Sequence, residues 1–293
     1  MTEHVRWPQG QQSAVVVTLD FNDIHGILTQ TPAVAGRDKT LSVWRYGTLR
    51  GVDRLLALLA EKNIRASWCL PAIVAEENPE VFARITAAGH EIACSGGTHQ
   101  NFDTLSLDEQ LACVTDGCSR LEALNGQRPV GFRTPAGQWK PGLADALSKA
   151  GIRWSSSWRG DDLPYFHPET RLVELPLHYE LEDEPYFAFN LSPAVPPGQS
   201  RIASYQQTLE NMKLDFQGFH RFGLCYVLRL HPEIIGTAGR ISLLAELLDF
   251  IASHNDVWIA TAEEVADYWQ TQPGNLPEHP AEIFHRQLQE QSL

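Results

Sequence analysis

The sequence has no long apolar segment, no surplus of basic residues and no cysteine pair with the spacing of a zinc clip. Its 23 Lys and Arg stand against 36 Asp and Glu, and the formal net charge of -13 argues against nucleic acid or an anionic membrane as a partner. No apolar run approaches the roughly 20 residues of a membrane-spanning helix. The N-terminus lacks a basic stretch followed by an apolar one, so we expect a cytoplasmic protein without a secretory signal.

The cysteines also give no sign of a disulfide framework. They are odd in number, scattered and mostly set among apolar residues, which is typical of free thiols in a reducing compartment. Hydrophobic residues make up 43% of the 293 residues, which is enough for a substantial core. Because no repeat and no shift in composition marks a boundary, we expect a single domain over residues 1–293, with a polar tail from about residue 273.

Short apolar runs alternate with amphipathic segments along the chain. We expect strands within 13–23, 65–71, 90–94, 131–135, 153–156, 172–176, 224–230 and 257–260, and helices over 49–62, 79–88, 106–124, 142–150, 204–219, 240–253 and 261–269. The polar segment 24–44 has no clear period and is expected to be a loop, as is the Pro-rich segment 180–200. This alternation predicts the α/β class, with a parallel sheet closed toward a β/α barrel.

Polar side chains follow the ends of successive predicted strands. They are Asp20, Asn22, Asp23, Ser95, His99, Arg133 with Trp139 nearby, Asp161, Asp162 and His231. Because the carboxyl ends of parallel barrel strands meet at one mouth, we expect these side chains to converge on one site. For any single residue, a role as a turn, cap or packing residue is the competing interpretation.

Four segments resemble motifs of the polysaccharide deacetylase family, and in particular its intracellular branch of peptidoglycan-deacetylase-like and allantoinase-like proteins. They are Thr18-Leu-Asp-Phe-Asn-Asp23, Gly89-His-Glu-Ile-Ala-Cys-Ser-Gly-Gly-Thr-His-Gln-Asn101, Phe132-Arg-Thr-Pro-Ala-Gly137 and Leu228-Arg-Leu-His-Pro232. The resemblance extends over about residues 6–270. It implies a deformed (β/α) barrel with about seven parallel strands, often assembled as a homo-oligomer.

The resemblance is incomplete at the expected metal ligands. In metal-using members, the first motif supplies a base Asp and then a metal-binding Asp, and the second motif supplies two His ligands. Here Asp20 holds the base position and His99 the second His position, but Asn22 and Ser95 stand at the other two. Amide and hydroxyl groups are weak zinc ligands, so we expect no cofactor. If zinc or another divalent metal is bound, its ligands would be His99 with Asp23 or Asn22, and His25 is a further candidate donor.

The same resemblance implies roles for the remaining residues. Asp20 would be the base, Arg133 the residue that pairs with it and keeps it ionised, and His231 the general acid. Substrate binding is assigned to Asn22, Ser95, His99, Trp139 and Asp162, and Trp44 and Tyr46 could add an apolar wall or belong to the core.

The leading functional hypothesis is a hydrolase of carbon–nitrogen bonds other than peptide bonds, acting without a metal on a small cyclic amide, imide or ureide. Amide, hydroxyl and imidazole groups would complement the carbonyls and N–H of such a substrate. One alternative is a metal-dependent N-deacetylase of an acetylated sugar or peptidoglycan fragment. Another is a non-catalytic relic that binds a small ligand. The expected partner is a small-molecule substrate, with neither nucleic acid nor membrane.

Overall fold

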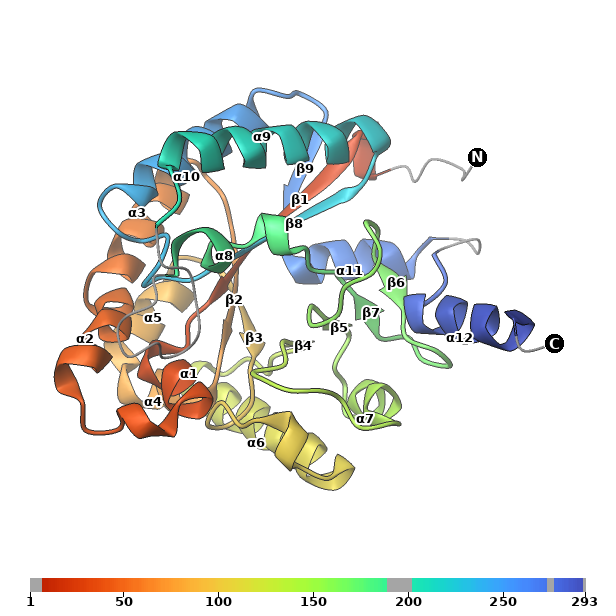
Figure 1. Ribbon diagram of the computed structural model, residues 1–293, viewed down its shortest axis with the longest axis horizontal. Coiled ribbons are helices and arrows are strands. Elements are labelled where there is room, and N and C mark those ends of the chain that lie inside the picture. The colour runs from red at the N-terminus through yellow and green to blue at the C-terminus, as the bar shows by residue number, and fades with distance from the viewer. Residues whose placement is uncertain (1–6, 189–201, 273–276, 292–293) are drawn as a thin grey trace.

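A single curled sheet forms the centre of the molecule, and helices cover its outer side (Figure 1). The computed structural model describes residues 7–188, 202–272 and 277–291. The strands are β1 (Ser13–Asp20), β2 (Ser67–Leu70), β3 (Glu91–Cys94), β4 (Gly131–Phe132), β5 (Trp154–Ser155), β6 (Tyr165–Phe166), β7 (Val173–Glu174), β8 (Cys225–Leu230) and β9 (Val257–Ala260).

The strand order is β6-β7-β5-β4-β3-β2-β1-β8, and β9 also pairs with β1. The pairs are parallel except for β6 with β7, which is antiparallel. The sheet curls into a half-barrel, so the predicted deformed (β/α) barrel is confirmed. The described sheet has nine strands where about seven were expected: the eight strand segments read from the sequence are all present, and β6 was not foreseen.

The helices lie between the strands in sequence. They are α1 (Asp23–Gln30), α2 (Asp38–Tyr46), α3 (Val52–Glu61), α4 (Ala72–Glu77), α5 (Pro79–Ala87), α6 (Leu107–Asn125), α7 (Leu143–Lys149), α8 (Glu184–Phe187), α9 (Tyr205–Phe222), α10 (Arg240–Ala252), α11 (Ala262–Gln270) and α12 (Pro280–Gln291). Shorter helical turns are η1 (Pro8–Gly10), η2 (Pro32–Val34), η3 (Gly47–Gly51), η4 (Phe102–Thr104) and η5 (Tyr179–Leu181). Capping boxes begin α6 at Ser106 and α11 at Thr261.

Strand β1 is the best-paired strand of the sheet. All of its residues are buried, and it pairs with β8 along most of its length, with β9 near its start and with β2 near its end. In this register Asp20 lies beside Cys69 of β2, and Leu19 lies beside Leu230 of β8. The residues that follow β1 and β8 therefore emerge side by side at one end of the sheet.

Two segments differ from the sequence-based expectation. Residues 24–44, expected as a loop, form α1, η2 and most of α2. The apolar period was missing because α2 has no buried residue and therefore needs no apolar face. The expected loop 180–200 begins with part of η5 and with α8, and the rest of it from residue 189 lies outside the described residues.

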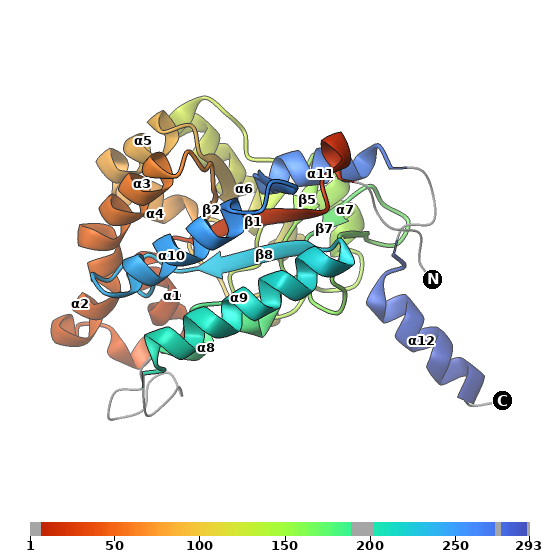
Figure 2. The ribbon, with the colours of Figure 1, turned by 90° about the horizontal axis from the view of Figure 1, so that it is seen from above.

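The C-terminal tail carries α12, which extends away from the barrel (Figure 2). His279, just before α12, is buried with its ring 5.1 Å from that of Trp158 and 5.0 Å from that of Tyr165. Within the part of the chain that the structure describes, no helix is long and apolar enough to cross a membrane. The cytoplasmic location and the homo-oligomer stay predictions.

Glycines allow η3 to pack directly on the backbone that follows β8. A Cβ atom on Gly51 would lie 2.1 Å from the carbonyl oxygen of Pro232, and one on Gly236 would lie 2.4 Å from the same oxygen. Both distances are shorter than any normal contact, so neither position can accept a side chain without a shift. This close packing fixes the segment that begins at His231.

Replacing Gly51 with Ala should therefore displace that segment. We expect Gly51→Ala to lower the free energy of unfolding by about 1–3 kcal/mol, the usual cost of overpacking. The matched control is Gly218→Ala in α9, where no atom lies within 4 Å of the added Cβ. This control should leave the protein unchanged or stabilise it by up to about 1 kcal/mol. Equal denaturation midpoints for Gly51→Ala and the wild type would contradict the close packing.

Candidate active site

The carboxylate of Asp20 is held between two arginines at the end of β1. Arg133 Nη1 lies 2.7 Å from Oδ1, and Arg229 Nε lies 2.7 Å from Oδ2. Asp20 is only 3% exposed, and burial by itself would raise its pKa. The charges of the two guanidinium groups outweigh burial and hold the pKa well below its usual range. Asp20 is therefore a fixed negative charge at neutral pH.

Arg133, directly after β4, is locked in place by further hydrogen bonds. Its Nε donates to the carbonyl oxygen of Ser156 at 2.7 Å, and its Nη2 donates to Oγ of the same residue at 2.6 Å. Its Nη1 also donates to Thr18 Oγ1 at 2.8 Å. The structure thus brings Arg133 against Asp20, as the sequence suggests, and ties strands β1 and β4 together.

Arg229 is a site residue that the sequence analysis missed. It lies on β8 two positions before His231, and both side chains reach Asp20 Oδ2 from the end of that strand. Its Nη1 also contacts Glu182 Oε2 at 3.0 Å, and the other oxygen of Glu182 lies 2.5 Å from Arg159 Nη2. A charged residue inside the otherwise apolar run of β8 was the available signal, because such residues are seldom buried unless they are paired.

His231 follows β8 and is held by a second carboxylate. Its Nδ1 lies 2.7 Å from Asp183 Oδ1, and its backbone N–H donates to Oδ2 of Asp183 at 2.8 Å. Burial disfavours the protonated imidazole, but the charge and hydrogen bond of Asp183 outweigh it and raise the pKa of His231 well above its usual range. Its Nε2 faces Asp20 Oδ2 at 3.9 Å. No periodic pattern around Asp183 in the sequence indicates this role.

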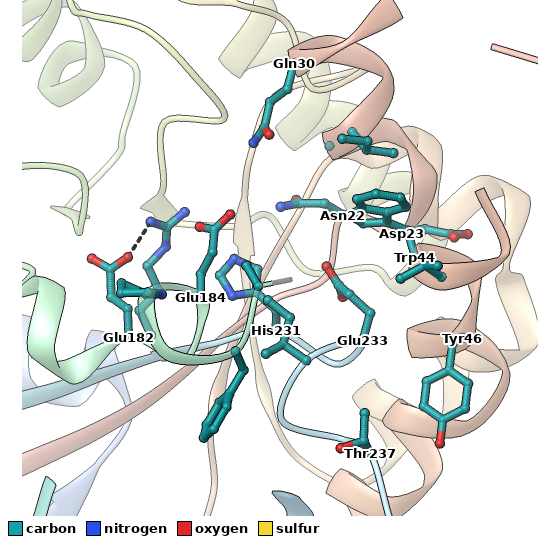
Figure 3. Close-up of a pocket in the computed structure, with 18 of the residues that line it drawn as sticks. Asn22, Asp23, Gln30, Trp44, Tyr46, Glu182, Glu184, His231, Glu233 and Thr237 are labelled. Atoms are coloured by element: carbon teal, nitrogen blue, oxygen red, sulfur yellow. Dashed lines mark hydrogen bonds and ion pairs between the residues drawn. The ribbon is translucent and has the colours of Figure 1, made fainter. Parts of the chain in front are cut away.

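A cavity of about 820 Å³ is lined by His231 and Arg229. Figure 3 shows His231 at this cavity. Asn22 and His99 line it, and so do the aromatic residues Trp44 and Tyr46. Its volume falls within the range of about 300–1,000 Å³ that is usual for small-molecule sites. Trp44 and Tyr46 thus line the cavity, in agreement with the apolar wall considered for them in the sequence analysis.

Two lining residues adopt the left-handed backbone conformation. Asp23 has φ 47° and His99 has φ 59°, values that cost energy for residues other than glycine and that often occur at functional sites. His99 is 2% exposed, and its Nδ1 has no hydrogen-bond partner. Burial lowers the pKa of His99 to about 4, so its imidazole is neutral at pH 7. The ring can then donate one hydrogen bond and accept another.

Three of the predicted substrate-binding residues do not line this cavity. Ser95 is buried at the end of β3. The Trp139 ring stacks on His167, and its Nε1 donates to Thr134 Oγ1 at 2.5 Å. Asp162 lies 3.0 Å from His178 Nε2. Asn22, His99 and His231 therefore line the cavity. Ser95, Trp139 and Asp162 do not.

Comparison with known proteins agrees with this architecture. Residues 43–155 match the family model described as Polysaccharide deacetylase. A crystal structure from Mycobacterium smegmatis, of a protein provisionally named a polysaccharide deacetylase, is 31% identical with a TM-score of 0.85 and covers 94% of this chain and 97% of that one. The chain belongs to the polysaccharide deacetylase family. Its members are hydrolases of C–N bonds other than peptide bonds, so the predicted enzyme class is confirmed.

Two other proteins are similar to this chain over most of its length. The peptidoglycan deacetylase of Helicobacter pylori is 23% identical over 251 residues, which is 74% of this chain and 83% of that protein. The crystal structure of the allantoinase PuuE is 21% identical with a TM-score of 0.79, and covers 94% of this chain and 95% of that one. At 21% identity, the similarity to this allantoinase shows a shared fold alone.

Polysaccharide deacetylases are usually metal-dependent, but the residues that the structure describes do not fit a metal site. Asp23, considered as a replacement ligand, lies 2.8 Å from Arg45 Nη1, and His25 lies 2.9 Å from Glu77. Among residues 7–188, 202–272 and 277–291, no group of three His, Cys, Asp or Glu side chains could hold a metal ion. A zinc site needs at least three such protein donors.

The Asp183–His231 contact leads to a direct test. In Asp183→Asn the negative charge is lost while the side-chain shape stays, so burial becomes the dominant influence on His231. We expect the pKa of His231, followed by NMR titration of its imidazole nitrogens, to fall to about 6.5 or lower. The control is the exposed Glu180→Gln, which should leave that pKa unchanged. If the pKa of His231 is the same in Asp183→Asn as in the wild type, Asp183 does not keep His231 protonated.

Proposed function

We propose that this protein hydrolyses a small cyclic amide, imide or ureide without a catalytic metal. The observation that carries the proposal is the donor set of the cavity, which is lined by an amide, a neutral imidazole and a protonated imidazole. Asn22 and His99 line the cavity beside His231, and the ionised Asp20 lies just behind it. Amide and imidazole groups match the alternating carbonyls and N–H groups of a cyclic imide or ureide.

Asp20 can act on the attacking water, and His231 can act on the leaving nitrogen of the same reaction. Their facing atoms are 3.9 Å apart, so a single water molecule can lie within hydrogen-bond distance of both. Asp20 orients this water and accepts its proton as the oxygen attacks the carbonyl carbon. His231 donates its proton to the leaving nitrogen when the C–N bond breaks. The carboxyl proton of Asp20 then passes to His231, which restores both groups.

The strong stabilisation of ionised Asp20 favours a reactive substrate. A carboxylate with a pKa held far below its usual range is a weak proton acceptor, so it gives limited help to the attacking water. The carbonyl must therefore be electrophilic and the leaving nitrogen stable. Imides and cyclic ureides meet both conditions, because a second carbonyl on the nitrogen withdraws electrons from it. The name of the fold relative PuuE, an allantoinase, supports the same class.

A metal-dependent N-deacetylase of an acetylated sugar or peptidoglycan fragment is the second candidate. The name of the Helicobacter pylori relative favours it. It requires a metal site, and the donors described above do not supply one.

A substrate screen with and without chelator separates the two candidates. Cyclic imides, hydantoins, allantoin and N-acetylated amino sugars would be compared by product release. We expect turnover of at least one cyclic compound, unchanged by chelator, and a loss of about 100- to 10,000-fold in kcat for Asp20→Asn, because the water loses its base. The exposed Asp108→Asn is the matched control and should keep full activity.

Elemental analysis of the purified protein completes this test. Zinc bound in equal proportion to the chain and required for turnover would overturn the metal-independent proposal and favour the N-deacetylase.

A further inference from the structure

Glu233 is a second carboxyl group in the cavity, and the reaction described above does not use it. It follows His231 by two residues and lines the same cavity. Figure 3 shows its carboxyl group pointing into the cavity, in this view between Asn22 and His231. Its Oε2 is buried and has no hydrogen-bond partner. Leaving an ionised oxygen in this condition would be costly.

The packing of η3 explains why that oxygen is buried. A Cβ atom on Gly47 would lie 2.8 Å from the backbone nitrogen of Glu233 and 3.1 Å from its Oε2. Without a side chain, Gly47 lets the η3 backbone cover one side of the carboxyl group. Water is excluded from that side, while the group remains open to the cavity.

The charges around Glu233 do not neutralise it. His231 faces it from the end of β8, and the carboxylates of Asp183 and Glu184 face it from the start of α8. The charged groups on the elements packed against Glu233 are engaged elsewhere or exposed. Asp23 is paired with Arg45, and Arg50 of η3 is exposed. Arg54 of α3 donates hydrogen bonds to the Tyr46 hydroxyl and to the backbone carbonyl of Gly236. Burial is the largest influence, the two carboxylates add to it, and His231 opposes it. Together they raise the pKa of Glu233 to about 8.

We propose that Glu233 is a catalytic residue that stays protonated and donates a hydrogen bond to the substrate carbonyl oxygen as negative charge develops there. This inference rests on the proposed amide hydrolysis. Two carboxyl groups in one site then differ in role because their surroundings differ: the arginines keep Asp20 ionised for the water, and burial keeps Glu233 neutral for the carbonyl. The proton stays on Glu233 throughout, so no further acid or base is required. A donor of this kind stabilises the oxyanion, which in metal-using enzymes is the work of a Lewis acid.

The pH dependence of kcat/KM distinguishes this role from others. With a substrate identified in the screen, wild-type activity should fall as the pH rises through about 8, because Glu233 loses its proton. Glu233→Gln keeps an N–H donor that does not titrate, so it should retain activity within about tenfold and lose this alkaline limb. Glu233→Ala should lose about 100- to 1,000-fold in kcat with little change in KM. The exposed Glu282→Gln on α12 is the matched control.

Two results would overturn the inference. Activity that rises with pH, together with a higher KM for Glu233→Gln, would mean that Glu233 binds a cationic substrate group as a carboxylate. Full activity of Glu233→Ala would mean that the residue only fills space.

A measurement without substrate separates this inference from the proposed function. In protein with ¹³C-labelled Glu carboxyl groups, the Glu233 resonance is assigned by its absence from Glu233→Gln. We expect it to report a protonated carboxyl at pH 7 that titrates near pH 8. An ionised Glu233 at pH 7 refutes the inference even if cyclic substrates are cleaved. A protonated Glu233 in a protein that cleaves no amide, imide or ureide refutes the proposed function instead.

Discussion

The buried carboxylate of Asp20, paired with two arginines, is the interaction on which the site depends. An isolated charge with this burial would be unstable, and it persists because Arg133 and Arg229 each contact one of its oxygens. The arginines are in turn held by Ser156 and Glu182, so β1, β4, β8 and the segment before α8 meet at one point. Removing one partner would leave an uncompensated buried charge, at a cost of about 3–5 kcal/mol.

This arrangement also determines what chemistry the cavity can carry out. Both oxygens of Asp20 already accept charged hydrogen bonds, so the group is a weak base and a strong orienting charge. Reactivity must then come from the substrate and from groups that hold protons. His231, kept protonated by Asp183, is one such group. Under the proposed function, the family fold is retained, while Asn22 and His99 bind a polar ring by hydrogen bonds.

The alternation of apolar runs and amphipathic segments was sufficient to predict the barrel and its strand ends. It placed Asp20, Arg133 and His231 at one mouth because each lies at or just after the end of a parallel strand. It could not reveal the contacts of Asp183 or Glu233, since these depend on how non-periodic segments return to the cavity. Trp139 and Asp162 failed to reach the cavity wall for the same reason: a position near a strand end does not fix the direction of a side chain. Helix α2 was not predicted because it has no buried residue and therefore no apolar period in its sequence.

The ionisation of Asp20 itself tests the account most directly. Infrared difference spectra between the wild type and Asp20→Asn isolate the carboxyl band of this residue, and the band can be followed from neutral to acidic pH. We expect a carboxylate at every pH at which the protein remains folded, because Arg133 and Arg229 hold the charge. A carboxylic acid band that titrates at or above the ordinary aspartate pKa would contradict it and would make Asp20 a stronger base than its surroundings allow.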